Sequence, residues 1–322
     1  MKIKTIKRHI IVSTLLIVLI PLVILGTFSC ISTQYTTLKL ATENMVSTAE
    51  LAGQRVQWEL ESFIVSTEEV GCNAELANEN TSDKRRQEII DMKVLQYGMD
   101  RGCVINKDGL GSNGIDYSDR EYFKNAMNGK TTVTEPMIAR STGKMAVIVA
   151  APLWDNGVAG KKAVGCVYFV PHEEFLNDIV RDLKVSENST AYVLGKSGVI
   201  IADPDSEAVI NQQSYITMAE EDSGYRQLAE VNRKMIAGED GSDTIKINGK
   251  STLIGYAPIE GTDGWSIAVS APSMDYLDSS VTFIFITIAI ALICAIICSV
   301  NSAKTGMRIG GPVAQCAERL RL

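Results

Sequence analysis

The sequence predicts an α+β fold in which a long N-terminal helix carries two tandem modules with antiparallel sheets, flanked by two transmembrane helices. Three observations lead to this prediction. Two charge-free apolar runs lie near the ends of the chain, apolar residues recur at helical spacing after the first run, and short Val-rich segments follow. Helical and strand periodicities in separate regions of one chain are typical of an α+β protein.

The two apolar runs span residues 10–31 and 281–300. At about 1.5 Å per residue, each is long enough to cross a hydrocarbon core of roughly 30 Å. Pro21 in the first run is compatible with a membrane helix. A cleaved signal peptide is the alternative for that run, but its apolar region spans only about 7 to 15 residues. We therefore assign both runs as transmembrane helices.

Basic residues flank each run on the side nearer the chain terminus. They are Lys2, Lys4, Lys7 and Arg8 before the first run, and Lys304, Arg308, Arg319 and Arg321 after the second. Because basic flanks stay in the cytoplasm, residues 1–9 and 301–322 are expected inside. Residues 32–280 are then extracytoplasmic, in a multi-pass protein of the bacterial cell (inner) membrane.

The exported segment is acidic. Residues 32–280 contain 37 Asp and Glu against 23 Lys and Arg, a net charge of −14. A strongly acidic segment repels phosphate backbones, so nucleic acid is excluded as a partner. With about 250 residues, the segment is large enough for one large or two ordinary domains.

Cysteine and histidine are sparse. Cys72, Cys103 and Cys166 lie in the exported segment without any C-x-x-C spacing, and His9 and His172 are the histidines of the chain. This inventory predicts no metal site and no disulfide framework, although one bridge between Cys72 and Cys103 stays open.

The exported segment begins with helical spacing and continues with strands. Met45, Ala49, Ala52, Val56 and Leu60 recur three to four residues apart, which predicts a stalk helix over about residues 35–79. Further helices are predicted over residues 83–99, with Ser82 or Asp83 as the cap, and over 175–183 and 225–236. Strands are predicted over residues 145–151, 163–170, 191–194, 199–202, 244–247, 251–257 and 265–270.

An internal repeat divides these strands. Gly143 precedes Pro152 by nine residues, Gly249 precedes Pro258 by the same interval, and each proline is followed by a strand entered through a glycine. The repeat predicts two modules, one over about residues 80–184 nearer the far end of the stalk and one over about 185–275 nearer the membrane.

The most specific segment is Asp119-Arg120-Glu121-Tyr122-Phe123-Lys124-Asn125-Ala126, followed by Gly129-Lys130, Val133 and Pro136. It resembles the pocket segment of the double Cache domain, a pair of PAS-like modules in bacterial chemoreceptors and sensor kinases, and the resemblance covers roughly residues 35–278. Residues 308–313, Arg-Ile-Gly-Gly-Pro-Val, resemble the opening of a HAMP linker, with Pro312 at a helix start.

The resemblance implies extracytoplasmic small-molecule sensing and transmembrane signalling, as the input half of a methyl-accepting chemotaxis receptor. It also implies a homodimer that passes its signal to cytoplasmic machinery beyond residue 322. The input half of a sensor histidine kinase or a diguanylate cyclase is the alternative, and a membrane-anchored adhesion or hydrolytic protein is a more remote one. Catalytic residues and cofactors are not expected, because G-x-S-x-G, H-E-x-x-H and phosphate-binding glycine motifs are missing.

The resemblance also indicates the ligand site. Arg120 offers a planar fork for a carboxylate, and aromatic side chains beside it would form the walls. The candidate ligand-binding residues are Tyr117, Arg120, Tyr122, Phe123, Glu135, Trp154 and Tyr168. The alternative is that Tyr122, Phe123 and Ala126 form the core face of a short helix and that Arg120 pairs with Asp116 or Glu135.

The ligand is expected to be a small polar metabolite such as a carboxylate. The resemblance implies that amino-acid-binding members of the family hold the ligand's ammonium group with a Tyr-x-Asp segment and a later Asp. Met137 and Ala139 occupy the approximate Tyr-x-Asp positions here, and Val170 lies near the later Asp. An ammonium without such a partner would be buried at high cost. Standard amino acids are therefore not expected to bind in the usual manner. Arg140 either closes the pocket or faces solvent.

Overall fold

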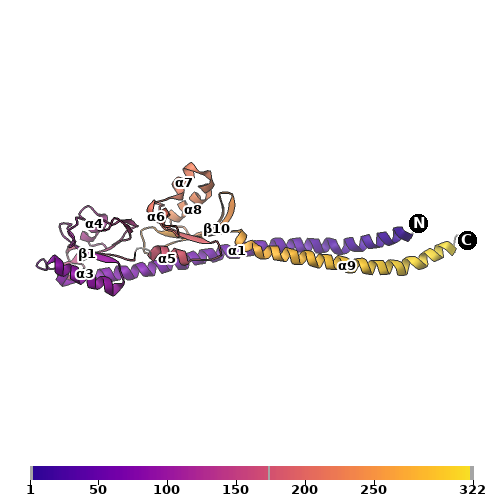
Figure 1. Ribbon diagram of the computed structural model, residues 1–322, viewed down its shortest axis with the longest axis horizontal. Coiled ribbons are helices and arrows are strands. Elements are labelled where there is room, and N and C mark those ends of the chain that lie inside the picture. The colour runs from indigo at the N-terminus through magenta and orange to yellow at the C-terminus, as the bar shows by residue number, and fades with distance from the viewer. Residues whose placement is uncertain (1–2, 173–174, 320–322) are drawn as a thin grey trace. The chain divides into compact units, whose positions relative to one another are not determined.

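The computed structural model describes residues 3–172 and 175–319. The chain divides into two compact units (Figure 1). The two-helix unit comprises Met1–Ala41 and Ser273–Leu322, and the α+β unit comprises Thr42–Pro272. Helix α1, Ile3–Gly71, contributes to both.

The two-helix unit pairs the first part of α1 with α9, Met274–Arg319, where Gly26 lies against the Thr287 side chain. Large apolar side chains point outward, and Phe28 is 71 % exposed. Each helix contains an 18-residue window apolar enough to cross a membrane, with mean hydropathies of 2.6 and 2.7. Such a surface matches lipid as its solvent, and both helices include the apolar runs seen in the sequence.

The remainder of α1 shows the predicted apolar stripe. Met45, Ala49, Ala52, Val56 and Leu60 are all buried. Four of them, from Ala49 on, join one hydrophobic cluster with residues of the second module, and Val70 joins another with residues of the first. One face of a single helix therefore supports both modules.

The first module contains a four-stranded antiparallel sheet in the order β1-β6-β5-β2. Its elements are α2 (Ala74–Ala77), α3 (Asp83–Tyr97), β1 (Arg101–Asn106), α4 (Glu121–Met127), β2 (Thr132–Val133), β3 (Met137–Ile138), β4 (Met145–Ala146), β5 (Val149–Trp154), the 3-10 turn η1 (Asp155–Gly157) and β6 (Ala163–Val170). Helix α3 begins as expected at Ser82, whose Oγ accepts the Arg85 N–H at 3.3 Å, and ends at the left-handed Gly98.

The sheet of the first module is covered on both faces. Val104, Val167 and Phe169 face α1 and α3 in one apolar cluster. Their neighbours Cys103 and Tyr168 face the opposite way, into the cluster that contains α4. Because side chains alternate along a strand, these short strands are apolar on both faces.

The second module contains a five-stranded antiparallel sheet in the order β8-β7-β11-β10-β9. Its elements are α5 (Phe175–Asp182), β7 (Thr190–Leu194), β8 (Ile200–Ala202), α6 (Ser206–Ile210), α7 (Tyr215–Glu221), the 3-10 turn η2 (Ser223–Tyr225), α8 (Arg226–Ile236), β9 (Gly241–Ile247), β10 (Lys250–Pro258) and β11 (Ser266–Pro272). Residues of α1 and α5 share one cluster with this sheet, and residues of α6 and α8 share another.

The strand orders show the internal repeat. The run β1-β6-β5-β2 of the first module has the same order as β7-β11-β10-β9 of the second. Cys103 opposes Tyr168 in one sheet as Tyr192 opposes Ala268 in the other. The α+β class with a long first helix and two modules of antiparallel strands agrees with the prediction.

Three details differ from the sequence expectations. Helix α1 ends at Gly71 instead of near residue 79, because Asn73 caps the separate helix α2. The predicted strand over 145–151 is divided into β4 and β5, with β4 paired to β3 in a hairpin of its own. Helix α9 continues through position 312 to Arg319, so the expected helix start at Pro312 is wrong.

The close packing of α1 on β10 gives a stability prediction. A Cβ atom at Gly255 would lie 2.6 Å from the backbone of Met45 and Val46. Gly255→Ala should therefore destabilise the α+β unit by about 1–3 kcal/mol, as overpacking does. Thermal and urea unfolding measure this, with the exposed Lys250→Ala on the same strand as control. Unchanged stability of Gly255→Ala would contradict the packing.

Candidate functional site

The loop between β1 and α4 is held by its own hydrogen bonds. The Asn106 side chain accepts the Leu110 N–H at 3.0 Å, and Gly109, with φ of 88°, turns the chain back. The Tyr117 N–H donates to the Gly109 carbonyl at 2.8 Å, and the Arg120 N–H donates to the Tyr117 carbonyl at 3.0 Å. This ordered loop places Tyr117 under α4 and Arg120 at its start.

Three tyrosines meet between the sheet and α4. Tyr117, Tyr122 and Tyr168, here called the tyrosine cluster, are each no more than 3 % exposed. The ring of Tyr168 lies edge-on to both others, at centroid distances of 5.5 Å from Tyr117 and 5.9 Å from Tyr122. The hydroxyls of Tyr117 and Tyr168 share a hydrogen bond of 3.0 Å, and Asn113 Nδ2 donates to Tyr117 at 2.8 Å.

Burial keeps these groups neutral. It raises the pKa of Tyr122 and Tyr168, and it raises the pKa of the thiols of Cys103 and Cys166 in the same apolar cluster. At neutral pH the cluster therefore presents hydroxyl groups and no thiolate nucleophile. Such a site can hydrogen-bond a polar ligand, but it supplies no strong base.

Arg120 directly precedes α4 and is half-buried. Its Nη2 donates to the Ile138 carbonyl at 3.2 Å. Within residues 3–172 and 175–319 it forms no ion pair, and neither Asp116 nor Glu135 is its partner. The guanidinium therefore retains donors that suit a carboxylate.

The β3–β4 hairpin, residues 137–146, lies against this loop through Arg140. The Arg140 Nη2 donates to Asp119 Oδ2 at 2.6 Å, and its Nη1 donates to the Asp116 carbonyl. The Arg140 guanidinium lowers the pKa of the Asp119 carboxyl. Arg140 is exposed, and its contacts fasten the hairpin to this loop. Its closing of a ligand pocket stays a prediction.

The other candidate residues occupy different places. Phe123 is buried on α4 in the same apolar cluster as the tyrosines. The ring of Trp154 lies against Gly129, just beyond the last residue of α4, whereas Arg120 precedes the first. Glu135 accepts the Lys196 N–H at 2.8 Å, so its carboxylate lies against a turn of the second module. The structure therefore groups Tyr117, Arg120, Tyr122, Phe123 and Tyr168 and leaves Glu135 and Trp154 outside.

Three apolar side chains that the sequence analysis compared with ammonium-binding residues lie near the tyrosines. Ala139 and Val170 are buried in the cluster that contains the tyrosines, and Met137 packs against it. None of these three side chains can pair with an ammonium group. The unfavourable binding of standard amino acids stays a prediction.

Sequence reasoning missed the hydrogen bond from Asn113 to Tyr117 and left Arg140 undecided. Both contacts depend on loop conformation. For Arg140, the signal available in the sequence was Asp119, an acid that needs a basic partner. Cys72 and Cys103 are both free, with Cys72 exposed and Cys103 buried, so the bridge left open between them is not formed. No group of three potential metal ligands occurs among the described residues.

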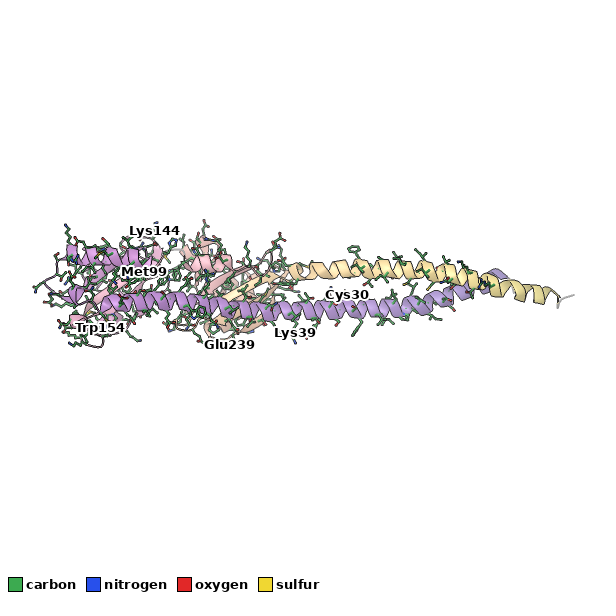
Figure 2. All side chains as sticks on the ribbon, turned by 90° about the horizontal axis from the view of Figure 1, so that it is seen from below. Cys30, Lys39, Met99, Lys144, Trp154 and Glu239 are labelled. Atoms are coloured by element: carbon green, nitrogen blue, oxygen red, sulfur yellow. The ribbon has the colours of Figure 1, made fainter. Side chains whose placement is uncertain are left out.

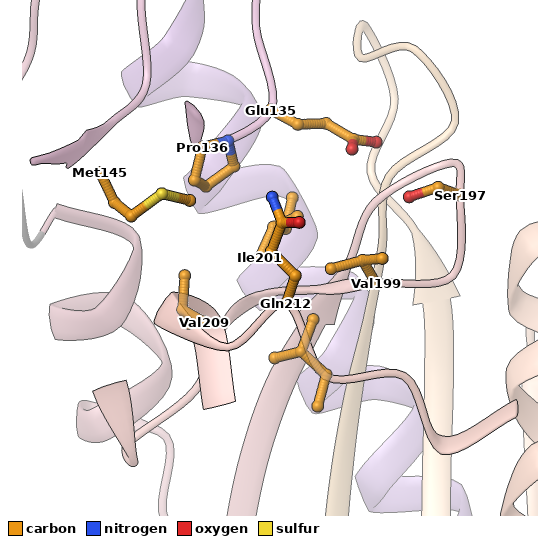
Figure 3. A pocket seen from close by; sticks show the side chains of 9 residues that line it. Glu135, Pro136, Met145, Ser197, Val199, Ile201, Val209 and Gln212 are labelled. Atoms are coloured by element: carbon orange, nitrogen blue, oxygen red, sulfur yellow. The ribbon is translucent and has the colours of Figure 1, made fainter. Parts of the chain in front are cut away.

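Figure 2 draws the side chains on the ribbon, with Trp154 and Lys144 of the first module labelled. Figure 3 shows a separate cavity, where Glu135 and Met145 of the first module face Val209 and Gln212 of the second.

Comparisons with known proteins agree with this architecture. The family model for the Cache domain (dCache_1) matches residues 34–280. The methyl-accepting chemotaxis protein PscA of Pseudomonas syringae pv. tomato is 24 % identical over 185 residues, covering 56 % of this chain and 26 % of PscA. The chain thus spans about a quarter of the length of that relative.

Two solved ligand-binding domains share the fold. That of the Pseudomonas fluorescens chemoreceptor CtaA, in complex with L-serine, has a TM-score of 0.57 at 18 % identity and covers 72 % of this chain and 97 % of its own. That of the Campylobacter jejuni chemoreceptor Tlp3, in complex with 4-methylisoleucine, has a TM-score of 0.58 at 11 % identity and covers 75 % and 94 %. Because the family model matches more than half of the residues, the chain belongs to the Cache domain family.

Proposed function

We propose that the α+β unit is the extracytoplasmic sensor of a transmembrane receptor and binds a small polar ligand at the tyrosine cluster. The observation that carries this proposal is the half-buried guanidinium of Arg120, which has no ion pair among the described residues and directly precedes the helix that carries buried Tyr122. The ligands of CtaA and Tlp3 support a sensing role, because both proteins are chemoreceptors of the same fold.

The ligand is a small carboxylate. Arg120 can bind a carboxylate through two parallel hydrogen bonds, and the tyrosine cluster can donate to its remaining polar atoms. An α-ammonium group would instead meet the apolar side chains of Met137, Ala139 and Val170. Leaving a charge unpaired in such surroundings is costly. The usual amino-acid complex is therefore disfavoured, even though CtaA was solved with L-serine.

The β3–β4 hairpin is the cover of this site. Arg140 fastens it to Asp119 and Asp116, and Arg120 contacts its Ile138 carbonyl. A ligand carboxylate would compete with Ile138 for Arg120, so ligand binding and hairpin position are linked. A ligand shifts such an equilibrium only through different affinities for the two arrangements.

In this proposal the chain is the input half of a methyl-accepting chemotaxis receptor. Its similarity to PscA, a methyl-accepting chemotaxis protein, supports this type of output. Sensor kinases and cyclases remain the competing outputs, because a sensor fold does not determine the module that follows. In this proposal the modules span about residues 80–184 and 185–275, residues 10–31 and 281–300 cross the membrane, and two copies form a homodimer. The domain itself has no catalytic role.

The exported region is suited to study alone. All four hydrophobic clusters lie within residues 49–269, inside the α+β unit. The chain covers 97 % of the CtaA domain and 94 % of the Tlp3 domain, each solved as a ligand-binding domain. A fragment of residues 34–280 therefore contains everything that this fold requires.

Calorimetry on this fragment tests the ligand site. We expect a mono- or dicarboxylate from a metabolite panel to bind, and Arg120→Ala to weaken that binding roughly 10- to 100-fold through loss of a charge-assisted contact. Lys124→Ala, which removes an exposed cation from the same helix, is the matched control. Tight binding of a free α-amino acid that depends on Arg120 would overturn the ligand class.

Amide hydrogen exchange tests whether Asp119 holds the β3–β4 hairpin over the site. At neutral pH, Asp119→Asn should raise exchange in residues 137–146 by about two- to fivefold, a modest effect because the ion pair is exposed. Asp108→Asn, in an exposed turn, is the control.

The effect of Asp119→Asn should also depend on pH. The pKa of Asp119 is lowered in the folded state, so its contribution is present above the ordinary Asp pKa of about 3.9 and is lost as the pH falls through the lower folded value. The difference between wild type and variant should then disappear. If the two proteins differ in exchange in acid, or do not differ at neutral pH, the Asp119–Arg140 ion pair does not hold the hairpin.

A further inference from the structure

A groove within the α+β unit separates the β3–β4 hairpin from β8 and α6. It consists of a cavity of about 440 Å³ and a neighbouring one of about 150 Å³. Both cavities are lined by Pro136, Met145, Ile201 and Val209, so they are neighbours that share these side chains as wall. Figure 3 shows the smaller cavity, with Pro136 and Met145 facing Ile201 and Val209.

The walls of this groove are largely apolar. The larger cavity adds Ile138 and Val147 on the first module, and Phe175, Leu176 and Ile210 on the second. Ile138 and Ile210, from the two modules, are each 61 % exposed, so their side chains are accessible to a ligand in the groove. A pocket of this size, mostly apolar with a few polar groups, is typical of small-molecule sites.

Two charged side chains that line the groove, Glu135 and Lys144, are already engaged. Glu135 at one end accepts the Lys196 N–H at 2.8 Å, and Lys144 at the other end also has a polar partner. An ionic ligand would have to displace these contacts or be desolvated without compensation. Ser197 and Gln212 beside Glu135 remain suited to a neutral hydroxyl or carbonyl group.

We propose that this groove is a second ligand site, for an uncharged molecule with an apolar body and one neutral polar group. A cavity of about 150 Å³ can hold benzene. The larger cavity therefore has room for a body of roughly eight to twelve carbon atoms on the same scale. The polar group would lie toward Ser197 and Gln212, and the body between Met145 and Ile210. This site is distinct from the tyrosine cluster and does not depend on the carboxylate proposal.

A matched series of probes on the 34–280 fragment tests the proposal. Octan-1-ol, octanoate and octylamine share one tail and differ in head group. By isothermal titration calorimetry, octan-1-ol should bind saturably with one molecule per chain, and the two charged probes should bind at least about tenfold more weakly because their heads would be desolvated. Non-saturable binding of octan-1-ol, or tighter binding of octanoate or octylamine, would overturn it.

Groove-filling variants locate the site. Met145→Trp and Ile210→Trp, on opposite walls, should each weaken octan-1-ol binding at least about tenfold by occupying its space. Leu95→Trp, at a leucine that is 84 % exposed on α3, is the control and should bind as wild type does. Thermal unfolding confirms that each variant is folded, and undiminished binding in both groove variants rejects the assignment.

Discussion

The architecture depends on the close packing of one face of α1 against two sheets. Gly255 lets β10 of the second module approach the backbone at Met45 and Val46, and Gly71 lets the helix end against the Pro152 carbonyl of the first. Because α1 covers one face of each sheet, the opposite faces are left for α4 and for α6 and α8. The tyrosine cluster lies on this second face, where buried hydroxyls find partners in one another.

The β3–β4 hairpin connects the two sites. Ala139 packs toward the tyrosine cluster, while Met145 lines the groove toward the second module. Exposed polar contacts from Arg140 and Arg120 fasten the hairpin to the α4 loop, and such contacts are individually weak. Glu135, between β2 and β3, reaches the second module at Lys196. The segment is therefore placed to report changes in one module to the other.

The sequence predicts those features that local periodicity determines. The stripe from Met45 to Leu60 follows the 3.6-residue period, and the repeated turns at Gly143 and Gly249 precede strands of equivalent order. Short helices such as α6 and α7 were missed, because their five to seven residues carry little periodic signal.

The candidate site was predictable in part. Tyr122, Phe123 and Ala126 are buried on α4, and helical spacing predicts this core face because Ala126 lies three and four residues after the two aromatic residues. The pairing of Asp119 with Arg140 depends on tertiary contacts between loops, which the spacing of residues in the sequence does not predict. The same holds for Glu135, whose partner lies 61 residues away.

The central claim is that the α+β unit lies outside the membrane that α1 and α9 cross. Cys72 is exposed, whereas Cys103 and Cys166 are buried, so a membrane-impermeant maleimide reports on one position of this unit. The account predicts labelling of a full chain that carries Cys30→Ser in intact spheroplasts, abolished by adding Cys72→Ser. Labelling that appears only after the membrane is permeabilised would contradict it.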